Sequence, residues 1–582
     1  MNTEWSLNEL YTGFEDPSYE KDFEKLKQAI DKQKLLADEA SGEVTAEQIG
    51  ALLTNLELIQ SLSYNLSAYL ELRQSVNTED GSIMAQSNRL LTLMSSGEET
   101  ASAVQKIFAR IPDVDAMAKA SPVVSQYAYL LKRAKEQASH FLSDEVEAMV
   151  SAMNMTGGNS WGQLQAYLTS TVKVPYGDEV LTLSEVRNLA YSPDKEVRKS
   201  AYEAELAAYD QIAGPIAFSL NNIKSQVNML CKKRGYASAL VLTLEQSDMK
   251  KETLDAMFTA IKEALPVFSK YLRHKAKLLG YKNGLPWYEL YAELGSSDKT
   301  YSLEETRDYL CRCFEGFTPD MVQMIEQAFA QSWIDFYPRS GKCGGAFCCS
   351  VPSIHQSRIL TNFDGYFGSI RTLAHELGHA YHNTCLDPMG FLVQDSPMQV
   401  AETASTFNEV LLGNYALAGA DDKERLSLLD SDLREQTQCI VDIYSRFLFE
   451  SAVFEQTEDK FLMPEDLKKL MLTAQREAFG DGLDPETLHP YMWVCKSHYY
   501  SSGLSFYNFP YAFGNLFAQG LYALYQEQGA SFVPKYKEML ASTGCKSIEQ
   551  IGAMMGIDLT RPDFWRQSLA QIAAEVEEFC RY

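Results

Sequence analysis

The sequence predicts a mostly α-helical fold with one small β element beside its most informative motif. Apolar side chains recur at helical spacing, with charged residues between them, in residues 19–30, 45–72 and 85–109. The same periodicity returns in residues 201–231 and 251–279, whereas extended patterns are short. Helices are therefore expected to make up most of the 582 residues.

Between these two helical regions lies a segment of different character. Residues 155–160 are glycine-rich and polar, which predicts a loop, and residues 172–183 alternate around Tyr-Gly-Asp, which predicts a β-hairpin. Ser192, followed by proline, is a suitable N-cap for the next long helix. We therefore divide the chain into an N-terminal helical lobe with a hairpin, residues 1–195, and a second domain, residues 196–582.

A second extended stretch, residues 359–363, directly precedes the motif described below. As a strand, it could offer its edge to an extended peptide, which is a recurring mode of recognition. A strand with a purely structural role fits the pattern equally well. The glycine-rich residues 337–347 lack the order of a phosphate-binding loop, so the sequence does not favour a nucleotide site there.

The composition excludes several classes of protein. Hydrophobic residues make up 46% and charged residues 22% of the chain, as in ordinary globular proteins. The formal net charge of −26 argues against nucleic acids and anionic membranes as partners. No apolar run approaches the roughly 18 residues that span a bilayer, and no secretory signal is evident. The eleven scattered cysteines indicate free thiols, so we expect a cytoplasmic protein.

The motif that carries the most chemistry is H-E-L-G-H, in which His375, Glu376 and His379 form H-E-x-x-H. On a helix the two histidines lie one turn apart on the same side, so both imidazoles can bind one Zn²⁺. Glu376 points away from that line and can reach a metal-bound water as a base. Ser369 is a suitable N-cap for this helix, and His382 shares the histidine face as a residue that supports the ligands or the structure.

A second acidic pattern follows at residues 402–409. If this segment is helical, Glu402 and Glu409 share one face, and two inward acids are costly unless they meet a cation or hydrogen-bond donors. Glu402 would complete a set of two histidines and one glutamate around one zinc ion per chain, with the fourth position left for water. Glu409 would orient a ligand histidine. The alternative is an exposed acidic face.

Near the end of the chain, residues 491–525 are crowded with tyrosines around His498. Aromatic residues at this density usually form a core. A histidine among tyrosines also supplies hydrogen-bond donors for an oxyanion that develops opposite a metal. Both interpretations stay open from the residues alone.

Three motifs together resemble oligoendopeptidase F, in the thimet oligopeptidase family of zinc peptidases: L-A-H-E-L-G-H-A-Y-H, A-E-T-A-S-T-F-N-E and H-Y-Y-S-S-G-L-S-F-Y-N-F-P-Y-A-F-G. The resemblance implies a two-lobed, clam-like α-helical fold with zinc at the floor of a deep channel. That channel would admit short, unfolded oligopeptides and exclude folded proteins.

By the same resemblance, His375, His379 and Glu402 bind zinc, and Glu376 is the catalytic base. His498 and Tyr507 would stabilise the tetrahedral intermediate. Tyr511 is the nearest candidate for a second family tyrosine, although proline occupies the position at the thimet-type spacing. The family's glycine-rich loop resembles residues 341–346, in which Gly344, Gly345 and Ala346 would help to hold the substrate backbone.

The expected function is therefore cleavage of internal bonds in oligopeptides by a zinc peptidase. A metzincin would need glycine at position 382 and histidine at 385, where this chain has His382 and Cys385. A zinc aminopeptidase and a non-catalytic peptide-binding protein with a structural zinc remain as alternatives. A di-iron bundle is disfavoured because two E-x-x-H helices are not evident. The sequence makes no prediction of the oligomeric state.

Overall fold

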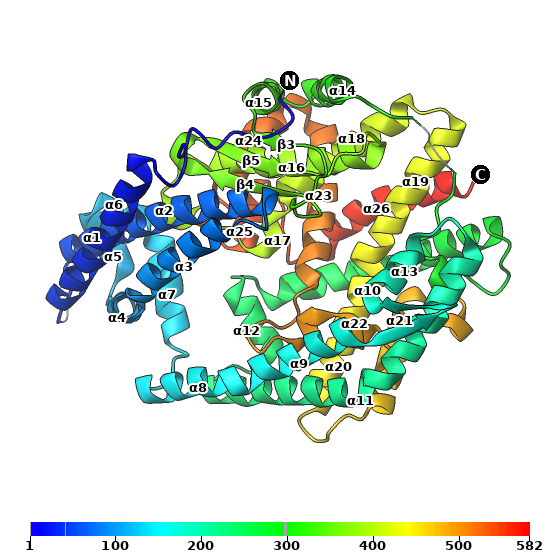
Figure 1. Cartoon of the computed structure of the whole chain (residues 1–582), viewed down its shortest axis with the longest axis horizontal. Helices are drawn as coiled ribbons and strands as arrows, with labels where there is room; N and C mark the ends of the chain where they lie inside the picture. The colour runs from blue at the N-terminus through cyan, green and yellow to red at the C-terminus, as the bar shows by residue number, and fades with distance from the viewer. Residues whose placement is uncertain (1, 41, 296–298) are drawn as a thin grey trace. The chain divides into compact units, whose positions relative to one another are not determined.

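Helices dominate the chain in the computed structural model, which describes residues 2–40, 42–295 and 299–582 (Figure 1). Contacts divide the chain into two compact units. Unit 1 comprises Met1–His140, Asp298–Tyr415 and Leu524–Met555; unit 2 comprises Phe141–Ser297, Ala416–Ala523 and Gly556–Tyr582. Both units are discontinuous in sequence, so they differ from the single division proposed at residue 195. Two of the boundaries fall inside continuous helices, where amphipathic periodicity gives no signal of a change of unit.

Unit 1 begins with a helical layer whose core is formed by apolar side chains at helical spacing. The long helix α2 starts at a capping box, in which Thr45 and Gln48 bond to each other's backbone N–H groups. The helices of this layer are α1 (Pro17–Glu39), α2 (Ala46–Val76), α3 (Gly81–Ser95), α4 (Glu98–Ala109), α5 (Val114–Ala120), α6 (Pro122–Gln126) and α7 (Ala128–Ala138).

The rest of unit 1 contains a small sheet, which lies beside the helix that carries the H-E-x-x-H motif (Figure 1). Its strands are β3 (Ile334–Asp335), β4 (Phe347–Val351) and β5 (Gln356–Leu360). Its helices are α14 (Leu303–Glu315), α15 (Pro319–Ala330), α16 (Phe367–Leu386), α17 (Met398–Ala401), α18 (Thr403–Gly419), α24 (Phe532–Ala541) and α25 (Ile548–Met554), of which α18 ends in unit 2.

The order of this sheet, β3-β5-β4, corrects one prediction. The strand predicted at residues 359–363 overlaps β5 (Gln356–Leu360) only at Ile359 and Leu360, where β5 lies between β3, to which it is parallel, and β4, to which it is antiparallel. At these two residues both edges of β5 are paired, so they cannot offer an edge to a peptide. Among the described residues, the outer edge of β4 pairs with no other strand.

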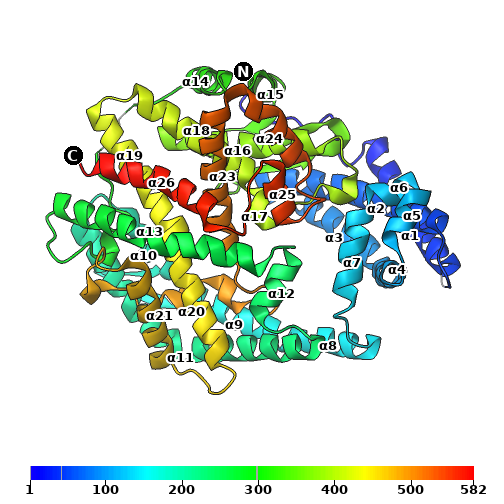
Figure 2. The same cartoon turned by 180° about the vertical axis from the view of Figure 1, so that it is seen from behind.

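Unit 2 contains long helices, some of which pack across large sequence separations; α13 and α26 lie side by side in both views (Figures 1 and 2). Its helices are α8 (Asp144–Thr156), α9 (Gly158–Thr171), α10 (Leu183–Asn188), α11 (Lys195–Arg234), α12 (Ala239–Gln246), α13 (Lys251–Leu278), α19 (Asp422–Gln436), α20 (Ile443–Gln456), α21 (Pro464–Phe479), α22 (Met492–Cys495), α23 (Phe509–Gln528) and α26 (Pro562–Phe579). Helix α23 ends in unit 1. A π-helical turn, Thr437–Asp442, joins α19 to α20.

The predicted hairpin is confirmed: β1 (Lys173–Tyr176) and β2 (Glu179–Thr182) pair antiparallel. Two local predictions were wrong. The stretch predicted as a loop at residues 155–160 is helical except at Gly157, which separates α8 from α9. The N-cap of α11 is Asp194 and not Ser192, because the Asp194 carboxylate accepts the Glu196 backbone N–H.

Short 3₁₀ turns complete both units, at Leu189–Tyr191, Trp287–Glu289, Pro352–Ile354, Phe391–Val393, Pro485–Thr487, Ser497–Tyr500 and Gly529–Ser531. All eleven cysteines are free. Within the described ranges, no helix has the length and apolar character needed to cross a bilayer.

Candidate metal centre

Helix α16 presents the H-E-x-x-H motif within unit 1. Its apolar side, which includes Leu373, Leu377 and Ala380, is fully buried, so the opposite side is left for the histidines. The helix begins earlier than predicted. Tyr366 is the N-cap, and Ser369 lies inside the first turn, where its hydroxyl donates to the Asp364 carboxylate at 2.7 Å.

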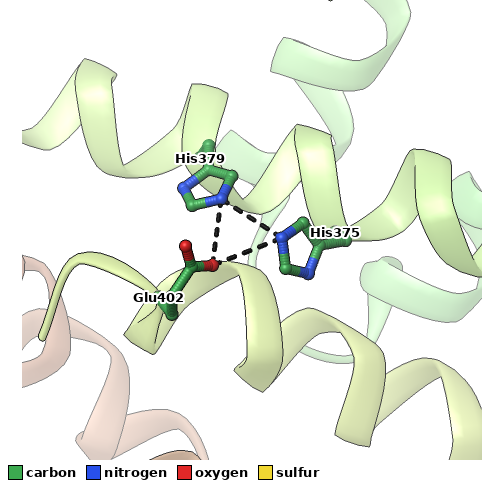
Figure 3. A group of neighbouring side chains, drawn as sticks. All are labelled: His375, His379 and Glu402. Atoms are coloured by element: carbon green, nitrogen blue, oxygen red, sulfur yellow. Dashed lines mark hydrogen bonds and ion pairs between the residues drawn. The ribbon is translucent and has the colours of Figure 1, made fainter. Parts of the chain in front are cut away.

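Three side chains converge on one point at this face (Figure 3). The Nε2 atoms of His375 and His379 are 3.2 Å apart, and Glu402 Oε2 lies 3.3 Å and 3.2 Å from them. Ligand atoms around a tetrahedral zinc ion are about 3.3 Å from one another when each bond is about 2.0–2.1 Å long. The spacing and the chemistry of these three donors therefore fit one zinc ion.

Glu402 reaches this point from a break between two helices. It is the C-cap of α17 and directly precedes α18, so the continuous helix predicted through this segment is interrupted at the proposed ligand. Ser405 Oγ donates to Glu402 Oε2 at 2.9 Å and holds the carboxylate. Burial would raise the pKa of Glu402, but its bonds to His375 and His379 outweigh burial and hold the pKa well below its usual range.

Glu409 belongs to α18 and bonds to the ring nitrogen of His375 that faces away from Glu402. Its Oε1 lies 2.5 Å from His375 Nδ1, and its Oε2 accepts from Arg371 Nε at 2.7 Å. A proton on Nδ1 leaves the Nε2 lone pair directed at the convergence point. Burial lowers the pKa of His375, but the hydrogen bonds to Glu402 and Glu409 raise it overall to about 10, so this site favours positive charge.

Arg371 was not predicted from the sequence. It lies four residues before His375, as His375 lies four before His379, so helical spacing alone places all three on one face. That spacing was the available signal.

Glu376 is buried, with 6% of its surface exposed, beside Cys348 of β4. Burial and the neighbouring Glu402 and Glu409 raise its pKa, against the opposing effect of the two histidines. A carboxylate with a raised pKa is a better proton acceptor than an exposed glutamate.

Close packing of α16 on α18 holds this cluster together. A Cβ at Gly378 would lie 2.5 Å from Ser405 Cα and 2.6 Å from the Ala404 carbonyl oxygen, so only glycine allows this approach. Asn408 Nδ2 also donates to the Ala374 carbonyl at 3.0 Å. Gly378 stands inside the motif, but no role was predicted for it from the sequence.

His382 is buried and does not join the three donor atoms. Its Nε2 lies 2.8 Å from Thr543 Oγ1 and 3.2 Å from the Leu540 carbonyl oxygen, which ties α16 to α24. Burial and the nearby His379 lower the pKa of His382 to about 4. This neutral ring also bonds to the Ala401 carbonyl, directly before Glu402.

The glycine-rich segment with Gly344, Gly345 and Ala346 forms the turn before β4. Gly345 has φ +80°, which favours glycine, and a Cβ at Gly344 or Gly345 would meet open space. Two side chains that sequence reasoning missed fix the turn. Asn362 Nδ2 donates to the Cys343 and Gly345 carbonyls at 3.1 Å and 2.8 Å, and Lys342 donates to three carbonyls while pairing with Asp335.

His498, Tyr507 and Tyr511 gather in unit 2. The hydroxyls of Tyr507 and Tyr511 are 2.6 Å apart, and the rings of His498 and Tyr507 have centroids separated by 5.8 Å. Phe506, directly before Tyr507, has φ +53°, an unusual conformation for a bulky residue that commonly marks functional segments. The structure thus brings this second group together within its own unit.

Two family models and several relatives match the sequence of this chain. A model described as peptidase family M3 matches residues 188–571, and one described as oligopeptidase F matches residues 112–173. Oligopeptidase PepF of Bacillus subtilis (strain 168) is 22% identical over 571 residues, covering 96% of this chain and 84% of the relative.

Two solved structures share the fold. A crystal structure from Chlamydophila abortus is 20% identical, with a TM-score of 0.86, and covers 100% of this chain and 98% of its own. That of oligoendopeptidase-F from Enterococcus faecium is 18% identical, with a TM-score of 0.70, over 96% of this chain and 98% of its own. The predicted fold class, mostly α-helical with a small β element, is confirmed.

Proposed function

Because the chain belongs to peptidase family M3, we propose that it is a zinc-dependent endopeptidase that cleaves internal bonds of short, unstructured oligopeptides. One observation carries the proposal: two imidazole nitrogens and one carboxylate oxygen converge at 3.2–3.3 Å, beside a buried glutamate that is not one of the three. Three protein ligands leave a position for water, as in catalytic zinc sites, whereas structural zinc sites use four.

His375, His379 and Glu402 would hold the zinc ion. When bound, zinc supplies a Lewis acid that polarises a carbonyl group and lowers the pKa of a water molecule. Glu409 keeps the His375 Nδ1 proton on the side away from the metal, so Nε2 stays a lone-pair donor. Arg371 holds Glu409 in that orientation.

Glu376 is proposed as the general base. It would accept a proton from the attacking water and deliver it to the leaving amine. Its raised pKa supports this role, because a carboxylate that binds a proton more readily is closer to the operating range of a base.

His498 and Tyr507 are proposed as donors to the developing oxyanion, with Tyr511 acting on Tyr507 through their 2.6 Å hydroxyl contact. The proposal rests on their chemistry, on their grouping and on the family resemblance. Removal of one such donor typically lowers kcat by about 10²–10³-fold.

The substrate backbone is proposed to bind along unit 1 next to the metal centre. Gly344, Gly345 and Ala346 offer an open backbone at the start of β4, and the outer edge of β4 can pair with an extended peptide. Tyr64 donates to the Ser350 carbonyl at 3.1 Å, so that part of the edge is already occupied. We further propose a cytoplasmic location, in keeping with the free thiols.

Cleavage of an internally quenched oligopeptide, with products identified by mass, tests this function. We expect internal cleavage that is lost with a chelator and restored by zinc. Glu376→Gln should bind zinc as the wild type does and cleave nothing measurable. Full activity in this variant would overturn the assignment of the base.

The same assay separates the alternatives. Stepwise loss of N-terminal residues would indicate an aminopeptidase. Bound zinc without any cleavage would favour a peptide-binding protein with a structural metal.

A further inference from the structure

His498 is held by one hydrogen bond whose direction can be deduced. Asn508 Nδ2 lies 2.6 Å from His498 Nε2. An amide nitrogen only donates, so Nε2 must accept with its lone pair if the amide stands in this orientation. Among the residues that the structure describes, none bonds to Nδ1 of the same ring.

Arg446 fixes the orientation of that amide. Its Nη1 donates to Asn508 Oδ1 at 3.0 Å, and a guanidinium has no acceptor. The amide oxygen must therefore face Arg446, and the amide nitrogen must face His498. Arg446 is itself paired with Asp442 one turn earlier, so the chain of contacts starts from a buried carboxylate.

Burial and the charges around the ring keep His498 neutral. Burial lowers the pKa of His498, and the cations Arg446, Lys496 and Lys224 lower it further, to about 3. Asp442 pairs with Arg446 and Glu450 pairs with Lys224, so the nearby carboxylates are engaged by cations. A neutral imidazole carries one proton, and a ring that accepts at Nε2 carries it on Nδ1.

We propose that Asn508, oriented by Arg446, holds His498 in the tautomer protonated on Nδ1, so that this N–H is the donor which His498 presents to a bound peptide. Asn508 and Arg446 are then positioning residues. The role of the donor rests on the proposed function, whereas the tautomer does not. An unconstrained ring would place the proton on either nitrogen and present a lone pair to the oxyanion part of the time.

Nitrogen-15 spectroscopy of protein labelled at histidine tests the tautomer directly. The ring signals of His498 are identified by their absence in His498→Gln. We expect a protonated Nδ1 and an unprotonated Nε2 at neutral pH. A proton on Nε2, or on both nitrogens, would overturn the proposal whether or not the chain cleaves peptides.

Asn508→Asp should reverse the direction of the hydrogen bond between residue 508 and His498 Nε2, with little change in the shape of the side chain. A carboxylate accepts from both Arg446 and the ring, so the proton should move to Nε2. We expect kcat to fall by about 10²–10³-fold, as when one oxyanion donor is removed, with KM changing far less. Wild-type kcat in a variant with its proton on Nε2 would refute the assigned donor.

Asn228→Asp is the matched control. Asn228 also lies in unit 2, and its amide donates to the Phe454 carbonyl at 3.0 Å, so it takes no part in the Asn508–His498 contact. It should leave both the His498 signals and kcat unchanged. If Asn508→Asp does not fold, Asn508→Ala should give signals from both tautomers, and a retained single Nδ1 tautomer would contradict the role of Asn508.

Discussion

The two groups of site residues place their histidines in opposite electrostatic surroundings. In unit 1, carboxylates surround imidazoles: Glu402 and Glu409 both bond to His375, and they favour positive charge there. In unit 2, cations surround an imidazole: burial, together with Arg446 and Lys496, keeps His498 neutral. The first arrangement suits a bound cation, and the second suits a neutral donor to an anion.

This difference teaches what each group has to avoid. Histidines that bind a metal must not be protonated on the ligand nitrogen, and in the proposed zinc site Glu409 would meet this need by holding the proton on His375 Nδ1. A donor to an oxyanion must keep its own proton and gain no second one. The neighbours of each histidine are therefore as informative as the histidine.

The largest effect that sharpens the comparison is expected from Tyr507→Phe. If its hydroxyl donates to the oxyanion, kcat should fall by about 10²–10³-fold with little change in zinc affinity. Tyr511→Phe should cost less, because Tyr511 would act through the 2.6 Å contact with Tyr507. Steady-state kinetics of both variants measure this order, with the exposed Tyr167→Phe as the control. The reverse order would make Tyr511 the direct donor.

A smaller effect, confined to unit 1, is expected from Glu409→Gln. The change removes the charge that pairs with Arg371 and orients His375, so zinc affinity should weaken by about 10–100-fold. Activity measured against buffered zinc concentrations reports this shift, and excess zinc should restore most of it. Glu538→Gln, an exposed change on α24, is the control. An unchanged zinc dependence would show that Glu409 does not support the ligand.

Gly378→Ala tests whether the cluster depends on the close approach of α16 and α18. The new Cβ would meet backbone atoms of Ser405 and Ala404 at 2.5–2.6 Å, and overpacking of this kind typically costs about 1–3 kcal/mol. We expect a lower Tm together with weaker zinc binding. Gly413→Ala, also in a helix but with open space at its Cβ, should instead be neutral or stabilising by up to about 1 kcal/mol. Equal Tm values for the two variants would contradict this account.

Local patterns predicted that the residues of the first group would meet, and His375, His379 and Glu402 do converge. His375 and His379 belong to one helix, and their spacing alone brings them to one side, so the resemblance to the family could be stated and is confirmed by the family match. Arg371 shares that face, so the same helical spacing could have identified it. Glu402 was predicted as a ligand on the assumption that its segment is one continuous helix. In the structure α17 ends at this residue.

The remaining features depend on contacts that a single sequence does not encode locally. The central position of β5 follows from pairing on both edges, and β4 has no alternation that would predict a strand. Asn508 and Arg446 lie on different segments, so their joint hold on His498 appears only after folding. Each compact unit is assembled from three separate segments of the chain. Hydrophobic periodicity describes one segment at a time, so it does not show which segments pack together.

A fourth effect tests the neutral histidine of unit 2 through stability. Its pKa falls from 6.5 to about 3 in the folded chain, so protonation favours the unfolded state. The stabilising contribution of neutral His498 is complete above pH 6.5 and is lost as the pH falls from there towards 3. Urea titrations at decreasing pH measure this effect. The free energy of unfolding of the wild type should fall more steeply with pH than that of His498→Gln, and the difference in slope should correspond to up to about one proton taken up on unfolding. Parallel curves for the two proteins would mean that His498 is not held neutral by burial and its cationic neighbours, and the contrast between the two histidine environments would then rest on unit 1 alone.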